Sequence, residues 1–279
     1  MINSVLVATD GSEHGAIAIE YGISLARRLS AELRGLTVID IKIIQGPLFD
    51  DLSGFMGVAP SQEFVSLIEK SLNERADGIL KEFDEKCLAE GVRPILKKRM
   101  GVVDDVIVEE GQDADLIILA QKGEHYLLTK RGLLGSTTES VIRKSTKPVL
   151  VTPLEYRTIG RIGIAYDGSE PAGRALDAAL DVSKLTGWSV SAVVITDEAA
   201  RAADVNGQLN EACGKRGMQC PLSVRAGKDE QEILDFADGG AVDLLVMGAY
   251  GRSRIRELIL GSTTTFVIRR SSIPVLLVR

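Results

Sequence analysis

The stretch VLVATDGSE at residues 5–13 decides the fold, because the chain repeats it as IGIAYDGSE at residues 162–170. Each copy is a short apolar run that ends in Asp-Gly-Ser. The match continues without a gap, at a constant separation of 157 residues, as far as Asp40 and Asp197. Self-similarity at a fixed separation marks a repeated structural unit. We therefore expect two copies of one fold in tandem.

The later part of each copy repeats as well. The run GSTT at residues 135–138 returns at 261–264, and PVL at 148–150 returns at 274–276. The separation is here 126 residues, so the first copy carries about 31 extra residues near 41–71. This insertion is expected to cover the ligand pocket of the first copy, to bind a second, more apolar ligand, or to be a loop over the sheet or the domain interface.

The repeat predicts domains at residues 1–153 and 160–279, which fits the usual domain size of roughly 100–200 residues. Apolar runs too short for helices alternate with helical periods in each copy. Strands are expected at 3–9, 33–39, 93–99, 115–120 and 148–152, and again at 161–166, 189–195, 221–226, 242–247 and 274–278. Nearly continuous apolar strands that alternate with helices predict an α/β fold, a doubly wound five-stranded parallel sheet in each domain.

Composition excludes several classes of protein. The net charge is -6, only 4% of residues are aromatic and no dense basic run occurs, which argues against nucleic-acid binding. The N-terminus has no signal-peptide pattern, and no apolar run reaches the length of a membrane span. The three cysteines are scattered and odd in number, as in a reducing compartment, and are expected in the core. A cytoplasmic location without membrane contact is the expectation.

A glycine-rich loop follows the fourth strand of the second copy. Gly248 and Gly251 are followed by nine residues and then by Gly261-Ser262-Thr263, which opens a helix. Glycines allow close approach of the backbone to a ligand, and free N–H groups at a helix start bind phosphate oxygens. Arginines within the loop add positive charge. The spacing therefore predicts a phosphate site, although the glycines could also serve only as turns.

An aspartate ends the first strand of each copy, at the same sheet edge as the glycine-rich loop. Asp167 and Asp10 each begin an Asp-Gly-Ser sequence. In doubly wound sheets, ligands bind beyond the carboxyl ends of the strands, where the strand order reverses. The carboxylate is therefore expected to contact a ribose or base edge. The alternative is that it only caps the following helix.

Taken together, these motifs and the terminal PVLLV at 274–278 resemble the universal stress protein family over essentially the whole chain, as a tandem member. The resemblance implies a Rossmann-like, adenine nucleotide alpha hydrolase-like sheet with strand order 3-2-1-4-5 in each domain. It implies ATP, or AMP or ADP, as ligand, with Mg²⁺ left open. It also implies pairing of the two domains through their last strands, while further homodimer formation stays open.

The resemblance also assigns the contacts of the second copy. Ala165, Tyr166, Asp167 and Ile195 would contact adenine and ribose, whereas the phosphate contacts would be Gly248, Gly251, Arg252, Gly261, Ser262, Thr263 and Thr264. The first copy keeps the corresponding Asp10, Val38, Gly123, Gly135 and Ser136 as a second, degenerate site.

The first copy departs from the motif in two ways. Ala120 stands where the first glycine is expected, and eleven residues instead of nine separate Gly123 from Gly135. If position 120 needs a positive φ, its Cβ costs about 1 kcal/mol. Nucleotide binding in the first copy therefore stays an open alternative to a turn without ligand, or to a site for another small molecule.

Three functions are left open. The first is a cytoplasmic nucleotide-binding protein of the stress response, regulatory in role, with the nucleotide held mainly in the second domain. The second is a slow ATPase, which the absence of a Walker-type lysine and of a carboxylate pair for Mg²⁺ disfavours. The third is an interaction scaffold.

His14 and His125, the only histidines, do not cluster with other ligands as a metal site would, so we expect neither a metal site nor catalytic residues.

Overall fold

The computed structural model describes residues 2–45, 62–123, 134–249 and 260–279. In this part of the chain, ten strands form one sheet in the order β3-β2-β1-β4-β5-β10-β9-β6-β7-β8. The strands of the first repeat are β1 (Ser4–Ala8), β2 (Glu32–Asp40), β3 (Ile95–Gly101), β4 (Leu116–Ala120) and β5 (Val149–Thr152). Those of the second are β6 (Arg161–Ala165), β7 (Ser189–Ile195), β8 (Leu222–Arg225), β9 (Leu244–Gly248) and β10 (Val275–Val278).

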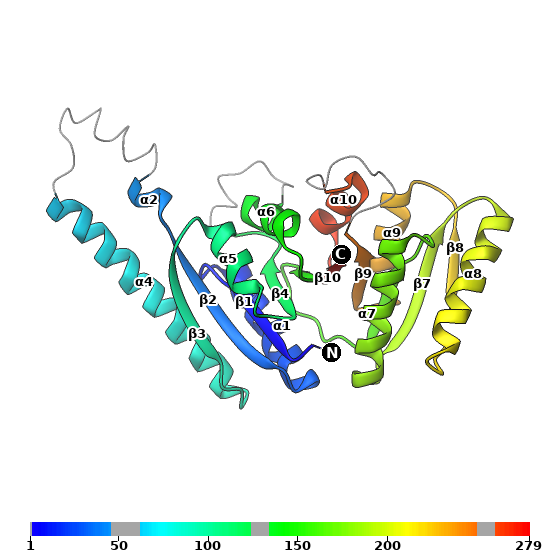
Figure 1. The fold of residues 1–279 in the computed structure, drawn as a ribbon, viewed down its shortest axis with the longest axis horizontal. Coiled ribbons are helices and arrows are strands. Elements are labelled where there is room, and N and C mark those ends of the chain that lie inside the picture. The colour runs from blue at the N-terminus through cyan, green and yellow to red at the C-terminus, as the bar shows by residue number, and fades with distance from the viewer. Residues whose placement is uncertain (1, 46–61, 124–133, 250–259) are drawn as a thin grey trace.

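Each half of the sheet is parallel and has the predicted strand order 3-2-1-4-5. The halves meet where β5 pairs antiparallel with β10, with Leu150 opposite Leu276. The two expected five-stranded sheets are therefore the halves of one continuous sheet (Figure 1). Because the junction is antiparallel, the strands of the two halves run in opposite directions across it, and within each half the first and fourth strands end at the same edge.

Helices cover both faces of the sheet (Figure 1). Those of the first repeat are α1 (Glu13–Leu29), α2 (Lys42–Gln45), α4 (Gln62–Ala89), α5 (Val103–Gly111) and α6 (Ser136–Lys144). Those of the second are α7 (Glu170–Thr186), α8 (Ala199–Gly214), α9 (Asp229–Asp238) and α10 (Ser262–Arg270).

Two apolar clusters form the layers of the core. Alternate residues of a strand go to opposite clusters, as Val5 and Leu6 of β1 do. One cluster receives the buried faces of α1, α4, α7 and α8, and the other those of α5, α6, α9 and α10. The three cysteines are free and buried, as expected. Within the described residues no helix is long and apolar enough to cross a bilayer.

Part of the insertion is helical. α4 has 28 residues whereas its counterpart α8 has 16, so its first turns, from Gln62 to about residue 71, belong to the inserted segment. Only the later turns pack on the sheet, through Ala76, Phe83 and Cys87. Phe64 and Leu67 in the earlier turns are about half exposed or more. Residues 46–61 of the insertion lie outside the described part of the chain.

Candidate functional site

Each repeat has a cavity at the carboxyl edge of its half of the sheet. The cavity of the first repeat has a volume of about 190 Å³ and that of the second about 370 Å³. Both lie between the end of the first strand, the end of the fourth strand and the start of the last helix of the repeat. This is the position at which the strand order reverses, where open α/β sheets bind ligands.

The Asp-Gly-Ser turn has the same geometry in both repeats. In the second, Asp167 Oδ1 accepts a hydrogen bond of 3.0 Å from the Ser169 amide, and Gly168 adopts φ +75°. Ser169 is the N-cap of α7, and its hydroxyl oxygen accepts from the Ala172 amide at 3.3 Å. The helix is therefore capped by the serine and not by the aspartate. Oδ2 of Asp167 has no hydrogen bond to another described residue and is available to a ligand.

In the first repeat the aspartate faces the glycine-rich loop across the cavity. Ser12 caps α1, and its own amide donates to Asp10 Oδ1 at 3.0 Å. A Cβ added to Gly123 would lie 2.8 Å from Asp10 Oδ2, so the loop backbone passes close to the carboxylate. Arg75 of α4 donates to the Asp10 carbonyl at 3.4 Å. The helix that carries the insertion therefore contacts the rim of this site.

The last helix of each repeat begins at its cavity without a side-chain cap. The N-cap residues of α6 and α10 are Gly135 and Gly261, which have no side chain to accept from the first N–H groups. Such N–H groups, together with the helix dipole, favour a bound anion. Neither glycine has a positive φ, and a Cβ at either would meet only atoms at 3.6 Å or more. A small substitution at either glycine is therefore compatible with the fold.

The cavity of the second repeat contains most of the residues expected there. Seven of them line it: Ala165, Tyr166, Asp167, Ile195, Gly248, Thr263 and Thr264. Gly261 and Ser262 lie at the adjacent helix start but do not line the cavity. Gly251 and Arg252 lie outside the described residues. The Tyr166 ring is buried in the core, where its hydroxyl lies 3.4 Å from Gln208 Oε1, so its backbone is the part suited to a ligand.

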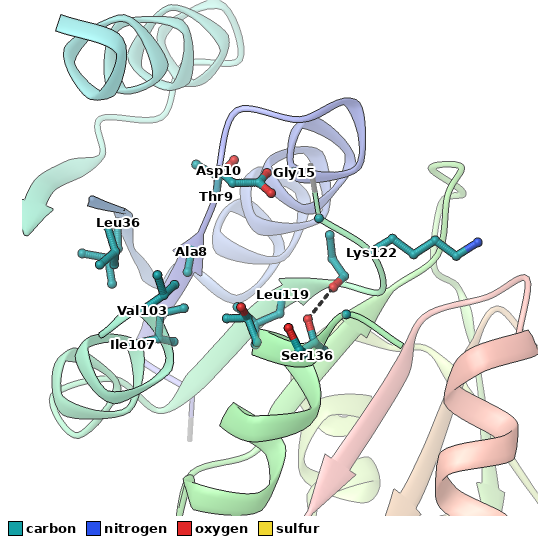
Figure 2. Close-up of a pocket in the computed structure, with 16 residues that line it drawn as sticks. Ala8, Thr9, Asp10, Gly15, Leu36, Val103, Ile107, Leu119, Lys122 and Ser136 are labelled. Carbon is teal, nitrogen blue, oxygen red and sulfur yellow. Dashed lines mark hydrogen bonds between the residues drawn. The ribbon is translucent and has the colours of Figure 1, made fainter. Parts of the chain in front are cut away.

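All five residues expected at the second site line the cavity of the first repeat: Asp10, Val38, Gly123, Gly135 and Ser136. Figure 2 shows apolar side chains, among them Leu36, Val103 and Ile107, along one side, with Asp10 across from them. The Lys122 side chain extends away from the other labelled residues. The site is therefore formed mainly by apolar walls, one carboxylate and a helix start.

Gly248, at the end of the fourth strand, is required for a reason other than the positive φ considered in the sequence analysis. Neither Gly248 nor Ala120 has a positive φ. A Cβ at Gly248 would instead lie 2.8 Å from the backbone carbon of Pro171 at the start of α7. The first repeat has His14 at the position of Pro171 and accommodates alanine. Ala120 is therefore no sign of backbone strain in the first repeat.

The motif-based reasoning missed two charged residues of the second cavity. Arg201 lies in the first turn of α8 and Asp229 in the first turn of α9, and both line the cavity. Each follows the carboxyl end of a strand, β7 and β8, which is the signal that could have identified them. The corresponding position to Asp229 in the first repeat is Val103, which lines the other cavity.

The two sites are linked across the junction of the repeats. Gln121, next to the loop of the first site, is buried and donates to the Ile268 carbonyl in the last turn of α10. Arg279 donates in turn to the Arg143 carbonyl of α6 at 2.8 Å. The C-terminal ends of both phosphate-site helices thus receive donors from the opposite repeat.

The described residues contain no group of three His, Cys, Asp or Glu side chains placed to hold a metal ion. In the second cavity, Asp167 offers one carboxylate oxygen, and Mg²⁺ is usually held by one or two carboxylates together with substrate phosphates.

Comparison with known proteins agrees with this architecture. The sequence profile described as the universal stress protein family matches residues 1–153 and 191–279. A universal stress protein of Synechocystis, Slr1230, is 31% identical over 288 residues, which cover all of both chains. The universal stress protein MJ0577 of Methanocaldococcus jannaschii is 33% identical over 157 residues, 54% of this chain and 94% of that protein.

A solved structure shows the same fold over the full length. The crystal structure of a universal stress protein from Archaeoglobus fulgidus superimposes with a TM-score of 0.79 at 24% sequence identity. The match covers 100% of this chain and 99% of the other. The tandem arrangement of two repeats is therefore shared along the whole chain.

Proposed function

Because the chain belongs to the universal stress protein family, as a tandem member, we propose that it is a cytoplasmic regulatory protein of the stress response that binds ATP or AMP. The nucleotide is held mainly in the second repeat, by the residues named above. In this proposal residues 1–153 and 160–279 act as two domains, and the β5–β10 pairing holds them together. Bound nucleotide stabilises one conformation, or one partner-binding state, of the protein.

The observation that carries this proposal is the pairing of a carboxylate with an uncapped helix start in one cavity. Asp167 uses only Oδ1 for the hydrogen bond within its own turn, and α10 begins at Gly261 without a side-chain cap for its first N–H groups. The first turn of α10 contains no acidic residue that would oppose an anion. A ribose hydroxyl can donate to the carboxylate while phosphates accept from the helix start. Apolar Ile195 provides a wall for the base.

Binding is favoured over rapid hydrolysis. In the described part of the second cavity, the acids are Asp167 and Asp229, and no histidine lines it. General base catalysis requires a group within reach of the attacking water, with a pKa suited to the reaction. Slow turnover by a residue of the loop 250–259 is the second candidate function. An interaction scaffold without nucleotide is the third.

The substitution Gly261→Val tests the proposal. A valine at this position fits the backbone angles of φ -58° and ψ 147°, yet its side chain occupies the anion position. We expect ATP affinity measured by calorimetry to fall about 100-fold, because hydrogen bonds to the charged phosphate are lost. Thermal unfolding of the free protein checks that the variant folds.

The nucleotide released after denaturation of the purified protein provides a second measurement. About one ATP or AMP per chain supports binding, and phosphate release then separates binding from hydrolysis. An unchanged ATP affinity in Gly261→Val would contradict the site assignment. Absence of any nucleotide binding by the parent protein would leave the scaffold as the function.

A further inference from the structure

The mouth of the second cavity carries two charged side chains that the proposed nucleotide contacts do not use. Arg201 and Asp229 both line the cavity, from the first turns of α8 and α9. Neither side chain forms a hydrogen bond or ion pair with another described residue. A guanidinium and a carboxylate that line one cavity and have no partner among the described residues suit a ligand that offers both acceptors and donors.

The strand order shows which end of a nucleotide they would meet. In the sequence of strands β9-β6-β7-β8, the phosphate helix α10 lies beside Gly248 at the end of β9. Arg201 and Asp229 follow β7 and β8, at the opposite end of the cavity. Ile195 at the end of β7 and Ile233, one turn beyond Asp229 on α9, supply apolar walls of the kind that hold a flat ring. A nucleotide with its phosphates at α10 therefore places its base toward the two charges.

We propose that Asp229 and Arg201 read the polar edge of the base, so that the second site selects nucleotides whose purine carries its amino group at C6, as adenine does. The Asp229 carboxylate accepts from the exocyclic amino group, and Arg201 donates to a ring nitrogen next to it. A hypoxanthine base presents a carbonyl oxygen where adenine has its amino group, and this oxygen repels a carboxylate. The inference rests on the proposed function and adds a specificity for the base.

The first repeat provides the natural contrast. Its cavity has Val103 at the position of Asp229, so the same edge of a base would meet a side chain without donors or acceptors. A purely structural account of Asp229 is that an acid in the first turn favours α9 through the helix dipole. Glu230 lies in the same turn and outside the cavity, so it would share that role. This neighbour is the matched control.

The experiment compares ATP with ITP, the hypoxanthine nucleotide, by calorimetry on the full-length protein. Gly135→Val is introduced throughout so that the first site does not contribute. We expect this parent to bind ATP about tenfold more tightly than ITP, as for one hydrogen bond to a charged group at a partly exposed position. Asp229→Asn should bring the two affinities to within about twofold, because an amide can donate to the carbonyl oxygen. Asp229→Val should do the same, and Glu230→Gln should keep the parent ratio.

The outcomes separate this inference from the proposed function. Equal affinities in the parent, or a tenfold ratio that persists in Asp229→Asn and Asp229→Val, would overturn base reading by Asp229 while ATP binding itself still stands. Loss of the ratio in Glu230→Gln as well would also overturn it, because the effect would then come from the helix start. Binding of neither nucleotide by the protein without Gly135→Val would overturn the proposed function together with this inference.

Discussion

In both repeats a glycine allows a close contact at the start of the first helix, but the two contacts are different ones. In the second repeat, Gly248 at the end of β9 lies against the Pro171 backbone. The first repeat has Ala120 there. It instead has Gly15 in α1, where a Cβ would lie 2.5 Å from Thr9 Oγ1. The two glycines thus serve different contacts, Gly248 that of β9 with the start of α7 and Gly15 that of α1 with Thr9, and alanine in place of the motif glycine is not by itself loss of the pocket.

The sites also differ in charge. The first turn of α6 contains Glu139, which lies 3.7 Å from Arg269 of the opposite repeat, whereas the first turn of α10 contains no acid. An acid near a helix start weakens its attraction for an anion. The second cavity also has the larger volume, about 370 Å³ against 190 Å³. The comparison favours the second repeat for a nucleotide and the first for a smaller, more apolar ligand.

The largest expected change in stability comes from giving the second repeat, at Gly248, the alanine that the first repeat has at position 120. Gly248→Ala puts a Cβ 2.8 Å from the Pro171 backbone, which cannot move as a flexible side chain would. We expect the free energy of unfolding to fall by about 3 kcal/mol, as for overpacking of a tight contact. Urea unfolding measures the change.

A glycine in open space is the control for this substitution. A Cβ at Gly173 in α7 would meet no atom within 4 Å, so Gly173→Ala should stabilise by up to about 1 kcal/mol through helix propensity. If Gly248→Ala were as well tolerated as Gly173→Ala, the steric account of the glycine would be wrong. The difference between the repeats would then need another explanation.

A smaller effect should distinguish the two Asp-Gly-Ser turns. Gly11 and Gly168 both have positive φ, +79° and +75°, so alanine at either costs about 1 kcal/mol. A Cβ at Gly11 would also lie 2.6 Å from Ile79 of α4, whereas one at Gly168 would meet the end of the Gln208 side chain at 3.0 Å. We expect Gly11→Ala to cost about 2 kcal/mol and Gly168→Ala about 1 kcal/mol. Equal losses of unfolding free energy for the two variants, measured by urea unfolding, would show that Ile79 of α4 moves aside at no cost.

Much of the architecture could be predicted from the repeat. Buried parallel strands leave nearly continuous apolar runs, and the ten strands lie within about two residues of the expected ranges. The strand order followed from the resemblance, because periodicity alone does not rank strands in a sheet. The fusion of both halves into one sheet depends on backbone hydrogen bonds between β5 and β10, which apolar sequence does not encode uniquely.

Candidate site residues could be predicted from sequence where a short motif forms one characteristic backbone turn. Asp167 and Gly168 were recognisable because Asp-Gly-Ser at a strand end forms a characteristic turn. Arg201 and Asp229 were missed because charged residues in the first turn of a helix are usually solvated surface. Only the convergence of α8 and α9 on one cavity makes them site residues. Gly248 was recognised from the loop motif. Its packing against Pro171 could not be recognised, because Pro171 is distant along the chain.

The smallest expected effect concerns an aspartate at the opposite edge of the sheet. Hydrogen bonds from Arg161 hold the pKa of Asp243 below its usual value, and the Gly160 amide adds a third donor at 3.1 Å. In the first repeat, the bonds that the Asp115 side chain accepts from described residues come from the backbone amides of Asn3 and Ser4, at 2.8 and 3.1 Å. Charge-assisted bonds are stronger than neutral ones. Asp243→Asn should therefore cost about 1 kcal/mol at pH 7, and Asp115→Asn less.

The pH dependence tests the same comparison. A carboxyl whose pKa is lowered by folding stabilises the folded state above its unfolded pKa, about 3.9. This stabilisation is lost as the pH falls through the lower, folded pKa. The difference in unfolding free energy between the parent and Asp243→Asn should therefore be full at pH 7 and shrink toward pH 3. A difference that stays constant between these pH values in urea unfolding would show that Asp243 acts by shape alone, and that the ion pair with Arg161 does not distinguish the second repeat from the first.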